Sequence, residues 1–248
     1  MSKLFTIEFY KYFYEKILTK ERTEKEINFL KIFFNKSDKI LDLACGFWRH
    51  TEELLKIWYN VKWIDFSENF INFIKNKSKF KKNYFFWDII NEIKIWLFDK
   101  IYCLHTSFWY FSDKENEKII KNISNILNEN WLFILDLNNP YNDDLFKNWE
   151  TKLIKWTDYI IDKKKVKWNK LYFNRIIKKW EIKYIEKYFL RIYFDYELEK
   201  IAKKYNLNLI KKIWDFNNLL FNNNSKRMIL VFQKNNIIKT QSWQFLDR

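Results

Sequence analysis

The sequence predicts an α/β fold with a doubly wound, mostly parallel sheet and a small antiparallel β insert. Apolar, strand-like segments alternate with amphipathic helical segments from residue 36 to residue 139, as in a series of βαβ units. Residues 145–194 instead show alternating strand patterns joined by short turns. We therefore expect residues 1–144 and 195–235 to form one domain, residues 145–194 to form the insert, and residues 236–248 to form a tail.

The expected elements follow in chain order. Residues 1–35 have a helical pattern, and the apolar ILDLA segment at residues 40–44 is typical of a buried parallel strand. A helix is expected from about His50, followed by a second strand that ends at Asp65. After the insert, DYELEKIAKKYN predicts a helix, and LNLIKKIW and RMILVFQ predict a hairpin at the edge of the sheet.

The charge of the chain is high but carries little information about partners. The formal net charge is +15, yet 40 of the 46 basic residues are Lys and only 6 are Arg. Abundant Lys, Asn, Ile, Phe and Tyr beside only 2 Ala and 1 Pro is the bias of an A/T-rich gene. Because no cluster of Arg marks a base-reading surface, nucleic acid stays an alternative partner that is not favoured.

Cysteine, histidine and hydropathy patterns exclude several classes of protein. Cys45 and Cys103 give no disulfide framework and no metal-ligand spacing, and His50 and His105 are the only histidines. We therefore expect no metal. No apolar run reaches the 18 residues of a membrane-spanning helix, and the charged N-terminus lacks a signal-peptide core. We expect no membrane partner and a cytoplasmic location.

Two residue counts are unusual, because Gly occurs once and Trp occurs 13 times. Several Trp residues stand where a left-handed backbone or a close approach of the chain is expected, which are glycine positions. Trp58 follows a helix end, Asn130-Trp131 precedes a strand, and Trp168 and Trp180 stand at hairpin turns. Trp48 stands in the turn between the first strand and its helix, where a bulky side chain would block a ligand.

We infer that most of these Trp residues are UGA codons in a gene whose own decoding reads UGA as glycine. Trp and Gly together make 14 of 248 residues, an ordinary glycine content given an average of about 7%. The alternative is a protein that is truly rich in Trp. UGG codons at these positions would establish that alternative.

With glycine at positions 48, 58 and 63, residues 40–67 closely resemble motif I and the following acidic strand of the class I S-adenosylmethionine-dependent methyltransferases. Four further segments resemble the same family in the same order: YFFWDI at 84–89, FDKIYCLHTSFWYFSDKENEKIIKNI at 98–123, NENWLFILDLNNP at 128–140 and SKRMILVFQK at 225–234. The resemblance covers roughly residues 8–235. It implies a Rossmann-like sheet of seven strands, S-adenosyl-L-methionine as the cofactor, and methyl transfer.

The resemblance also implies which residues contact the cofactor. Asp65 would accept hydrogen bonds from the ribose hydroxyls, and Asp88 would bind the adenine amino group. Phe66 or Ile89 would lie against the adenine ring. The full expected set is Tyr14, Asp42, Ala44, Cys45, Gly46, Trp48, Asp65, Phe66, Asp88, Ile89 and His105. A nicotinamide-binding protein would share the acid at position 65, so Asp65 alone does not identify the cofactor.

Several of these residues have a structural alternative. Asp65 would then cap the following helix, Asp88 would be a turn residue, and His105 would be a satisfied polar residue. Tyr110 and Asn138 are expected on the substrate side, with packing alone as the alternative for Tyr110. The sequence assigns no catalytic base and no oligomeric state.

These observations lead us to expect a methyltransferase that acts on a small molecule, with the antiparallel insert over the mouth of its active site. Alignment of the acceptor with the sulfonium does most of the work in such a reaction, so a catalytic base is not required. An RNA or protein methyltransferase is the alternative enzyme. A non-catalytic binding module becomes the better interpretation if the Trp residues are genuine.

Overall fold

The structure is a computed structural model, and it describes residues 18–44, 46, 49–93, 96–105, 107–155, 158–179, 181–217 and 224–235. Tyr14, Cys45 and Trp48 of the expected cofactor set lie outside the described residues. Trp180, the first half of the expected N-terminal helix and the expected tail also lie outside them. The assignments made for these residues stay predictions.

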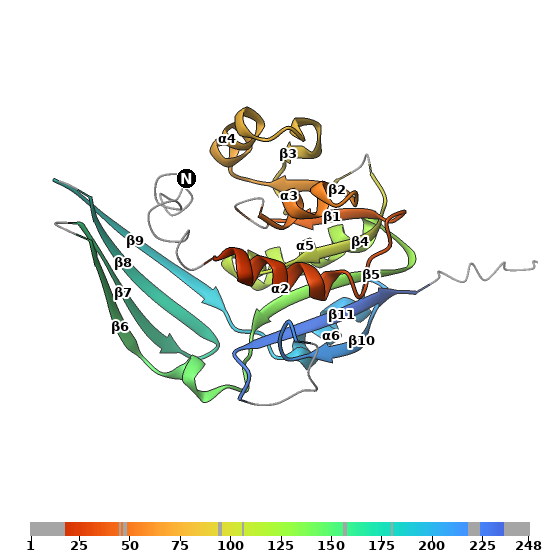
Figure 1. Ribbon diagram of the computed structural model, residues 1–248. Coiled ribbons are helices and arrows are strands. Elements are labelled where there is room, and N and C mark those ends of the chain that lie inside the picture. Colours follow the sequence, from red (N-terminus) through yellow and green to blue (C-terminus); the bar gives the residue numbers. More distant parts are fainter. Residues whose placement is uncertain are drawn as a thin grey trace, which may run out of the picture.

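A seven-stranded sheet forms the centre of the molecule (Figure 1). Its strands are β1 (Lys39–Leu43), β2 (Asn60–Asp65), β3 (Tyr84–Phe86), β4 (Phe98–Cys103), β5 (Leu127–Asn138), β10 (Leu207–Ile213) and β11 (Arg227–Lys234). Their order is β10-β11-β5-β4-β1-β2-β3. β1 to β5 pair in parallel, whereas β11 is antiparallel to both β5 and β10. The predicted doubly wound, mostly parallel sheet is therefore confirmed.

Helices cover both faces of this sheet. α2 (Lys20–Leu30) and α3 (Arg49–Lys56) pack on one face, and α5 (Asp113–Ile126) and α6 (Asp195–Lys203) pack on the other. α4 (Glu68–Lys77) packs beside β2 and β3. Side-chain caps fix where α2, α4 and α5 begin, through Thr19, Ser67 and Ser112. None of the described helices is both long enough and apolar enough to cross a membrane.

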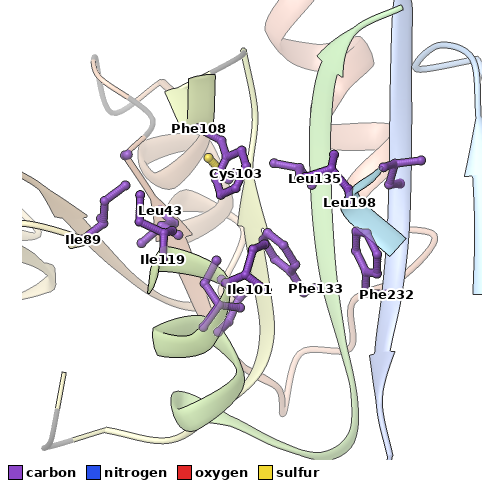
Figure 2. Close-up of a cluster of buried hydrophobic side chains, with 14 of the residues drawn as sticks. Leu43, Ile89, Ile101, Cys103, Phe108, Ile119, Phe133, Leu135, Leu198 and Phe232 are labelled. Carbon is purple, nitrogen blue, oxygen red and sulfur yellow. The ribbon is translucent and has the colours of Figure 1, made fainter. Parts of the chain in front are cut away.

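The core between the sheet and α5 fixes the position of the central strands. Figure 2 shows Leu43, Ile101 and Cys103, from neighbouring strands, together with Ile119 of α5. All four side chains are at most 2% exposed. Burial on both faces explains why these strands read as nearly continuous apolar runs. Loops that leave their carboxyl ends therefore start from a rigid platform.

The insert forms a separate antiparallel sheet beside the main one (Figure 1). Its strands, in spatial order, are β6 (Trp149–Lys155), β7 (Asp158–Lys167), β8 (Lys170–Lys179) and β9 (Ile182–Arg191). The ring of Tyr188 on β9 lies 6.0 Å from the ring of Tyr110, which follows β4 of the main sheet. We call the face of the insert that carries Tyr188 the inner face, and the opposite face the outer face. The predicted antiparallel insert is confirmed.

Trp58 occupies a helix end that is built for glycine. Its φ angle is 68°, and two hydrogen bonds close the end of α3: Trp58 N–H to the Leu55 carbonyl, and Tyr59 N–H to the Leu54 carbonyl. This pair of bonds defines a Schellman motif, in which the residue with positive φ is usually glycine. The indole of Trp58 is 86% exposed and contributes little packing. The expectation from the sequence is confirmed here.

Trp168 stands at the first central position of the two-residue turn between β7 and β8. Lys167 and Lys170 are the last paired residues, and Trp168 has a φ of 57°. Asn169, the second central residue, does not have a positive φ. This is the pattern of a type II′ turn, which favours glycine at the first central position. The Trp168 side chain is also 86% exposed.

Trp131 does not follow the expectation of a left-handed glycine position. At Asn130-Trp131 it is Asn130 that adopts the positive φ, of 67°, because β5 already begins at Leu127 and the chain kinks inside the strand. Trp63 on β2 is fully buried, and its indole packs edge-on against Tyr84 with the ring centroids 5.5 Å apart. Among the described residues, however, nothing accepts a hydrogen bond from its Nε1–H.

The backbone angles predict that Trp58→Gly and Trp168→Gly each stabilise the chain. Glycine removes the strain of a side chain in the left-handed region, which costs about 1–2 kcal/mol. Glycine also gives the unfolded chain more conformational freedom, which offsets part of this gain in stability. We expect each substitution to raise the free energy of unfolding by about 1 kcal/mol in urea denaturation.

Trp131→Gly is the matched control. Trp131 has an ordinary φ and is half-buried, with Lys100 Nζ 4.5 Å from its ring centroid, so glycine there should lower stability. Stabilisation by all three substitutions, or by none, would contradict the steric argument.

Candidate functional site

The carboxyl edge of the main sheet gathers the residues of the candidate site. β1 and β4 are neighbours, and the chain runs from β1 to one edge of the sheet and from β4 to the other. Ligands of open α/β sheets bind at such a change of strand order. Directly after β1, Ala44 has a φ of 53° and Gly46 a φ of 67°. A Cβ built at Gly46 would have no heavy atom within 4 Å, so this turn borders open space.

Asp65 joins the end of β2 to this turn. Its Oδ2 accepts a hydrogen bond from Gly46 N–H at 3.3 Å, and its Oδ1 accepts one from Ser67 N–H at 2.8 Å. The side chain is only 3% exposed, and this burial raises the pKa of Asp65 to about 7. The contact with Ser67, the N-cap of α4, is the structural role considered for Asp65. The contact with Gly46 places the same carboxylate beside the candidate cofactor turn.

Asp42 fixes the helix that follows the turn. It is fully buried in β1, and its Oδ2 accepts a hydrogen bond from the Thr51 hydroxyl at 2.7 Å. Thr51 lies in the first turn of α3, so this bond holds the N-terminus of α3 against the end of β1. Asp42 acts on the turn through this helix in the structure. Its expected place near the methionine end of the cofactor stays a prediction.

A buried charged cluster, which we call the Glu26 cluster, lies where α2 and α3 meet the end of β4. Glu26 is fully buried on α2 and accepts hydrogen bonds from Arg22 Nε at 3.0 Å and His50 Nε2 at 2.8 Å. His105 Nε2 lies 3.0 Å from the same carboxylate, and Arg49 also forms an ion pair with it. Arg22 in addition contacts His105 Nδ1 at 3.2 Å. One carboxylate thus connects two helices to a strand end.

The Glu26 cluster carries a net positive charge. Burial alone would raise the pKa of Glu26, but hydrogen bonds from His105 and His50 outweigh it and hold the pKa well below its usual range. Burial lowers the pKa values of His50 and His105 to about 4, so both rings are neutral at pH 7. The two positive charges of Arg22 and Arg49 then exceed the single negative charge of Glu26 by one. Glu26, His50 and His105 lie close enough to ligate a metal, but the two guanidinium groups already supply the cations that this carboxylate needs.

His105 occupies a strained position at the end of β4. Its φ is 58°, which is uncommon for a residue other than glycine. Its backbone N–H donates to Asp136 Oδ2 at 2.8 Å, and Arg227 donates to both oxygens of Asp136, at 2.8 and 2.6 Å. Asp136 is fully buried in β5. The ends of β4, β5 and β11 are therefore tied together, and His105 is held as a satisfied polar residue of the Glu26 cluster.

Three further residues of the expected cofactor set lie after β2 and β3. Asp88 Oδ1 accepts a hydrogen bond from Ile90 N–H at 3.0 Å, which is the turn role considered for it. Ile89 is 3% exposed and belongs to the core in Figure 2, whereas Phe66 is half-buried. Of the two residues expected against the adenine ring, Phe66 is thus the more accessible.

Aromatic side chains line the substrate side of the edge. Tyr110, in the short 3-10 helix η4 (Ser107–Tyr110), is 36% exposed and faces Tyr188 of the insert. Tyr188 stacks on Phe173 at 4.9 Å with an interplanar angle of 8°. Phe108 is 1% exposed and packs in the core. Asn138, at the end of β5, accepts a hydrogen bond from Arg227 at 2.7 Å, so its amide is held at this edge.

The sequence analysis missed the Glu26 cluster and the Asp136–Arg227 pair. A usable signal was present for each. Glu26 falls on the apolar face of α2 beside Ile27 and Leu30, and Asp136 is the single charge inside the apolar LFILDL segment. A charge at an apolar position indicates a buried partner, but it does not say which residue that partner is.

Comparison with known proteins supports this description. Residues 40–130 match a family described as a methyltransferase domain. No curated protein matches the chain by sequence. A solved S-adenosylmethionine-dependent methyltransferase from Clostridium acetobutylicum is 22% identical, with a TM-score of 0.76 over 92% of this chain and 99% of that chain.

Two further solved structures are similar. The CcbJ methyltransferase from Streptomyces caelestis is 15% identical, with a TM-score of 0.75 over 86% of this chain and 90% of that chain. CalS10 from Micromonospora echinaspora, an amino pentose methyltransferase solved with S-adenosylmethionine bound, is 10% identical, with a TM-score of 0.70 over 91% of this chain and 96% of that chain. Residues 40–130 are therefore similar to a methyltransferase domain, and the chain has the fold of these solved S-adenosylmethionine-dependent methyltransferases.

Proposed function

We propose that the chain is a methyltransferase that uses S-adenosyl-L-methionine and acts on a small-molecule acceptor. The observation that carries the proposal is the nearly buried Asp65 carboxylate at the end of β2, in contact with Gly46 N–H across the turn after β1. The family match and the fold support the cofactor. A cytoplasmic location stays a prediction.

The donor set fits the nucleoside part of this cofactor. Asp65 would accept hydrogen bonds from the two ribose hydroxyls, a pairing that strengthens when the carboxylate is ionised. Gly46 adopts a left-handed backbone with open space in front of it, which allows a ligand to approach the chain closely. Phe66 is accessible at the strand end for the adenine ring, and Asp88 follows β3 for the amino group. Ala44 belongs to the same turn, and a role for Cys45 stays a prediction.

The Glu26 cluster fits the amino-acid part of the cofactor. Its excess positive charge would attract the methionine carboxylate, and Arg22 is the more accessible of its two arginines, at 37% against 12% for Arg49. Glu26 would hold both guanidinium groups in place through its buried hydrogen bonds. Asp42 would act indirectly, by fixing α3, and His105 would position Arg22.

When bound, the cofactor supplies an activated methyl group on a sulfonium. The protein's task is to align the acceptor with that group and to exclude water, because alignment accounts for most of the acceleration in such a transfer. Tyr110, Tyr188 and Phe173 would form an apolar wall between the main sheet and the inner face of the insert. Asn138 would offer a polar group at the same edge. The aromatic wall and the polar Asn138 side chain fit a small acceptor such as an amino sugar. Two of the similar solved structures are named as an amino pentose methyltransferase and a sugar N-methyltransferase.

The direct test is titration of the Trp48→Gly chain with S-adenosylmethionine in a calorimeter, at pH 6 and pH 8. Ionisation of Asp65 should strengthen binding, so affinity should rise up to about tenfold per pH unit below pH 7 and level off above it. Binding below pH 7 should release up to about one proton, seen as a dependence on buffer ionisation enthalpy. Asp65→Asn should remove both effects and weaken binding at pH 8. Absence of heat at millimolar cofactor would contradict the proposal and leave a binding module.

The raised pKa of Asp65 also predicts how stability varies with pH. The carboxyl holds its proton more tightly in the folded chain, at about 7, than the unfolded value of 3.8. Its contribution to stability is therefore complete below about pH 4 and is lost as the pH rises through 7. Asp65→Asn should flatten this part of the pH profile in urea denaturation, and an unchanged profile would contradict the assignment.

Arg22→Ala separates the two parts of the cofactor site. It should weaken binding of S-adenosylmethionine about tenfold or more, since a charge-assisted contact is lost. It should leave the affinity for decarboxylated S-adenosylmethionine within about twofold, because that analogue lacks the carboxylate. Equal losses for both ligands would assign Arg22 a purely structural role.

Glu26→Gln tests whether the cluster is held by its single carboxylate. Breaking a buried ion pair leaves uncompensated charge, so the unfolding free energy should fall by about 3 kcal/mol. Glu24→Gln is the control on the same helix, because the Glu24–Lys20 pair is exposed and spans 3.6 Å, and it should cost less than about 1 kcal/mol. Similar losses in both variants would argue against a cluster centred on Glu26.

A further inference from the structure

The outer face of the insert is rich in lysine and poor in acidic residues. Strand pairing places eight lysines on it, one or more from each strand: Lys152, Lys163, Lys165, Lys167, Lys170, Lys178, Lys183 and Lys187. Glu150 is the single acidic residue on this face, and it pairs with Lys163 at 2.9 Å. The whole chain has 31 acidic for 46 basic residues. A biased gene composition would raise Lys everywhere, but it would not remove acids from one face only.

The inner face provides the internal comparison. The acidic residues of β7 and β9, namely Asp158, Asp162 and Glu186, all fall on the inner face. Asp162 is 9% exposed there and pairs with Arg175 at 2.5 Å. The same four strands thus separate their charges, with most of the acids on the inner face and eight lysines beside one acid on the outer face. That separation indicates an anionic partner for the outer face.

Aromatic rings lie among these lysines. Tyr172 and Phe189 are directly paired on β8 and β9, and Lys170 Nζ lies 4.6 Å from the ring centroid of Phe189. Tyr172 is 42% exposed. A hollow of about 480 Å³ is bordered by these two rings together with Lys163, Lys165 and Lys187. Cations around aromatic rings are the combination that binds phosphates and stacked bases.

One polar atom in the hollow is unsatisfied. Asn174 lies on β8 between Lys163 and Lys187, with which it is paired. Its side-chain oxygen is buried and has no hydrogen-bond partner within the described part of the chain. A buried acceptor without a donor is rare and is costly.

From these observations we propose that the outer face of the insert binds single-stranded RNA. Lysines contact the phosphates, and Tyr172 and Phe189 stack with bases. This activity is separate from methyl transfer, because the outer face is turned away from Tyr110. A second copy of the chain does not fit this face, since a symmetric contact would bring like charges together. A lipid surface would leave the hollow between these rings without a ligand.

The test is binding of a fluorescein-labelled 20-nucleotide oligouridylate, followed by fluorescence anisotropy between 50 and 300 mM KCl. Single strands lose about 0.7 in log affinity per log salt for each phosphate contact, so three contacts give a slope of about −2. Lys165→Glu with Lys187→Glu should weaken binding at least about tenfold and reduce the slope by about 1.4, since two phosphate contacts are lost. Tyr172→Ala should weaken binding about tenfold and leave the slope unchanged.

Lys118→Glu with Lys121→Glu is the matched control, because both residues are exposed on α5 and the change in charge is the same. That variant should bind within about twofold of the parent chain. Equal losses in the two double variants would overturn the proposal, since only overall charge would then matter. The proposal is also overturned if vesicles containing phosphatidylglycerol bind the chain but the oligonucleotide does not, or if light scattering finds a dimer that Lys165→Glu with Lys187→Glu disrupts.

Discussion

The hydrogen bond from Gly46 N–H to Asp65 is the interaction on which the candidate site depends. It connects the turn after β1 to the end of β2, and Gly46 has a left-handed backbone in this turn. Asp42 fixes the far side of the same turn through Thr51. The parallel sheet supports both acids, since its strands are buried on two faces and end at one edge. Burial of the ionised Asp65 carboxylate is unfavourable, and the hydrogen bonds from Gly46 and Ser67 offset part of this cost. These bonds hold the carboxylate at the edge of the sheet where a ligand would bind.

The central strands could be predicted from the sequence because they are buried runs of apolar residues between helices with clear periodicity. β1 and β2 end within a residue of the expected positions, at Leu43 and Asp65. The insert was recognisable from its alternation. The Glu26 cluster was not predictable, because it joins residues that are up to 83 positions apart and only the tertiary fold brings α2, α3 and the end of β4 together. The kink at Asn130 was assigned to the wrong residue, because β5 starts earlier than its turn residues indicate.

Backbone angles give the unusual Trp content a physical meaning. Trp58 and Trp168 occupy left-handed positions in a Schellman motif and a type II′ turn, and both indoles project into solvent. Neither contributes to a core, so packing does not explain them. Trp63, by contrast, is fully buried, and no acceptor among the described residues lies within hydrogen-bond distance of its Nε1–H. A glycine at position 63 would remove this buried donor. We propose that glycine is the native residue at most of these positions, and this applies most strongly to position 48, which falls in the candidate cofactor turn.

The most direct measurement compares the affinity of S-adenosylmethionine for the chain with Trp48 and for the Trp48→Gly chain, by calorimetry at pH 8. If the turn after β1 binds the cofactor through its backbone, the glycine chain binds at least about tenfold more tightly, because an indole would fill the approach. Equal or tighter binding by the chain with Trp48 would contradict the account of the site.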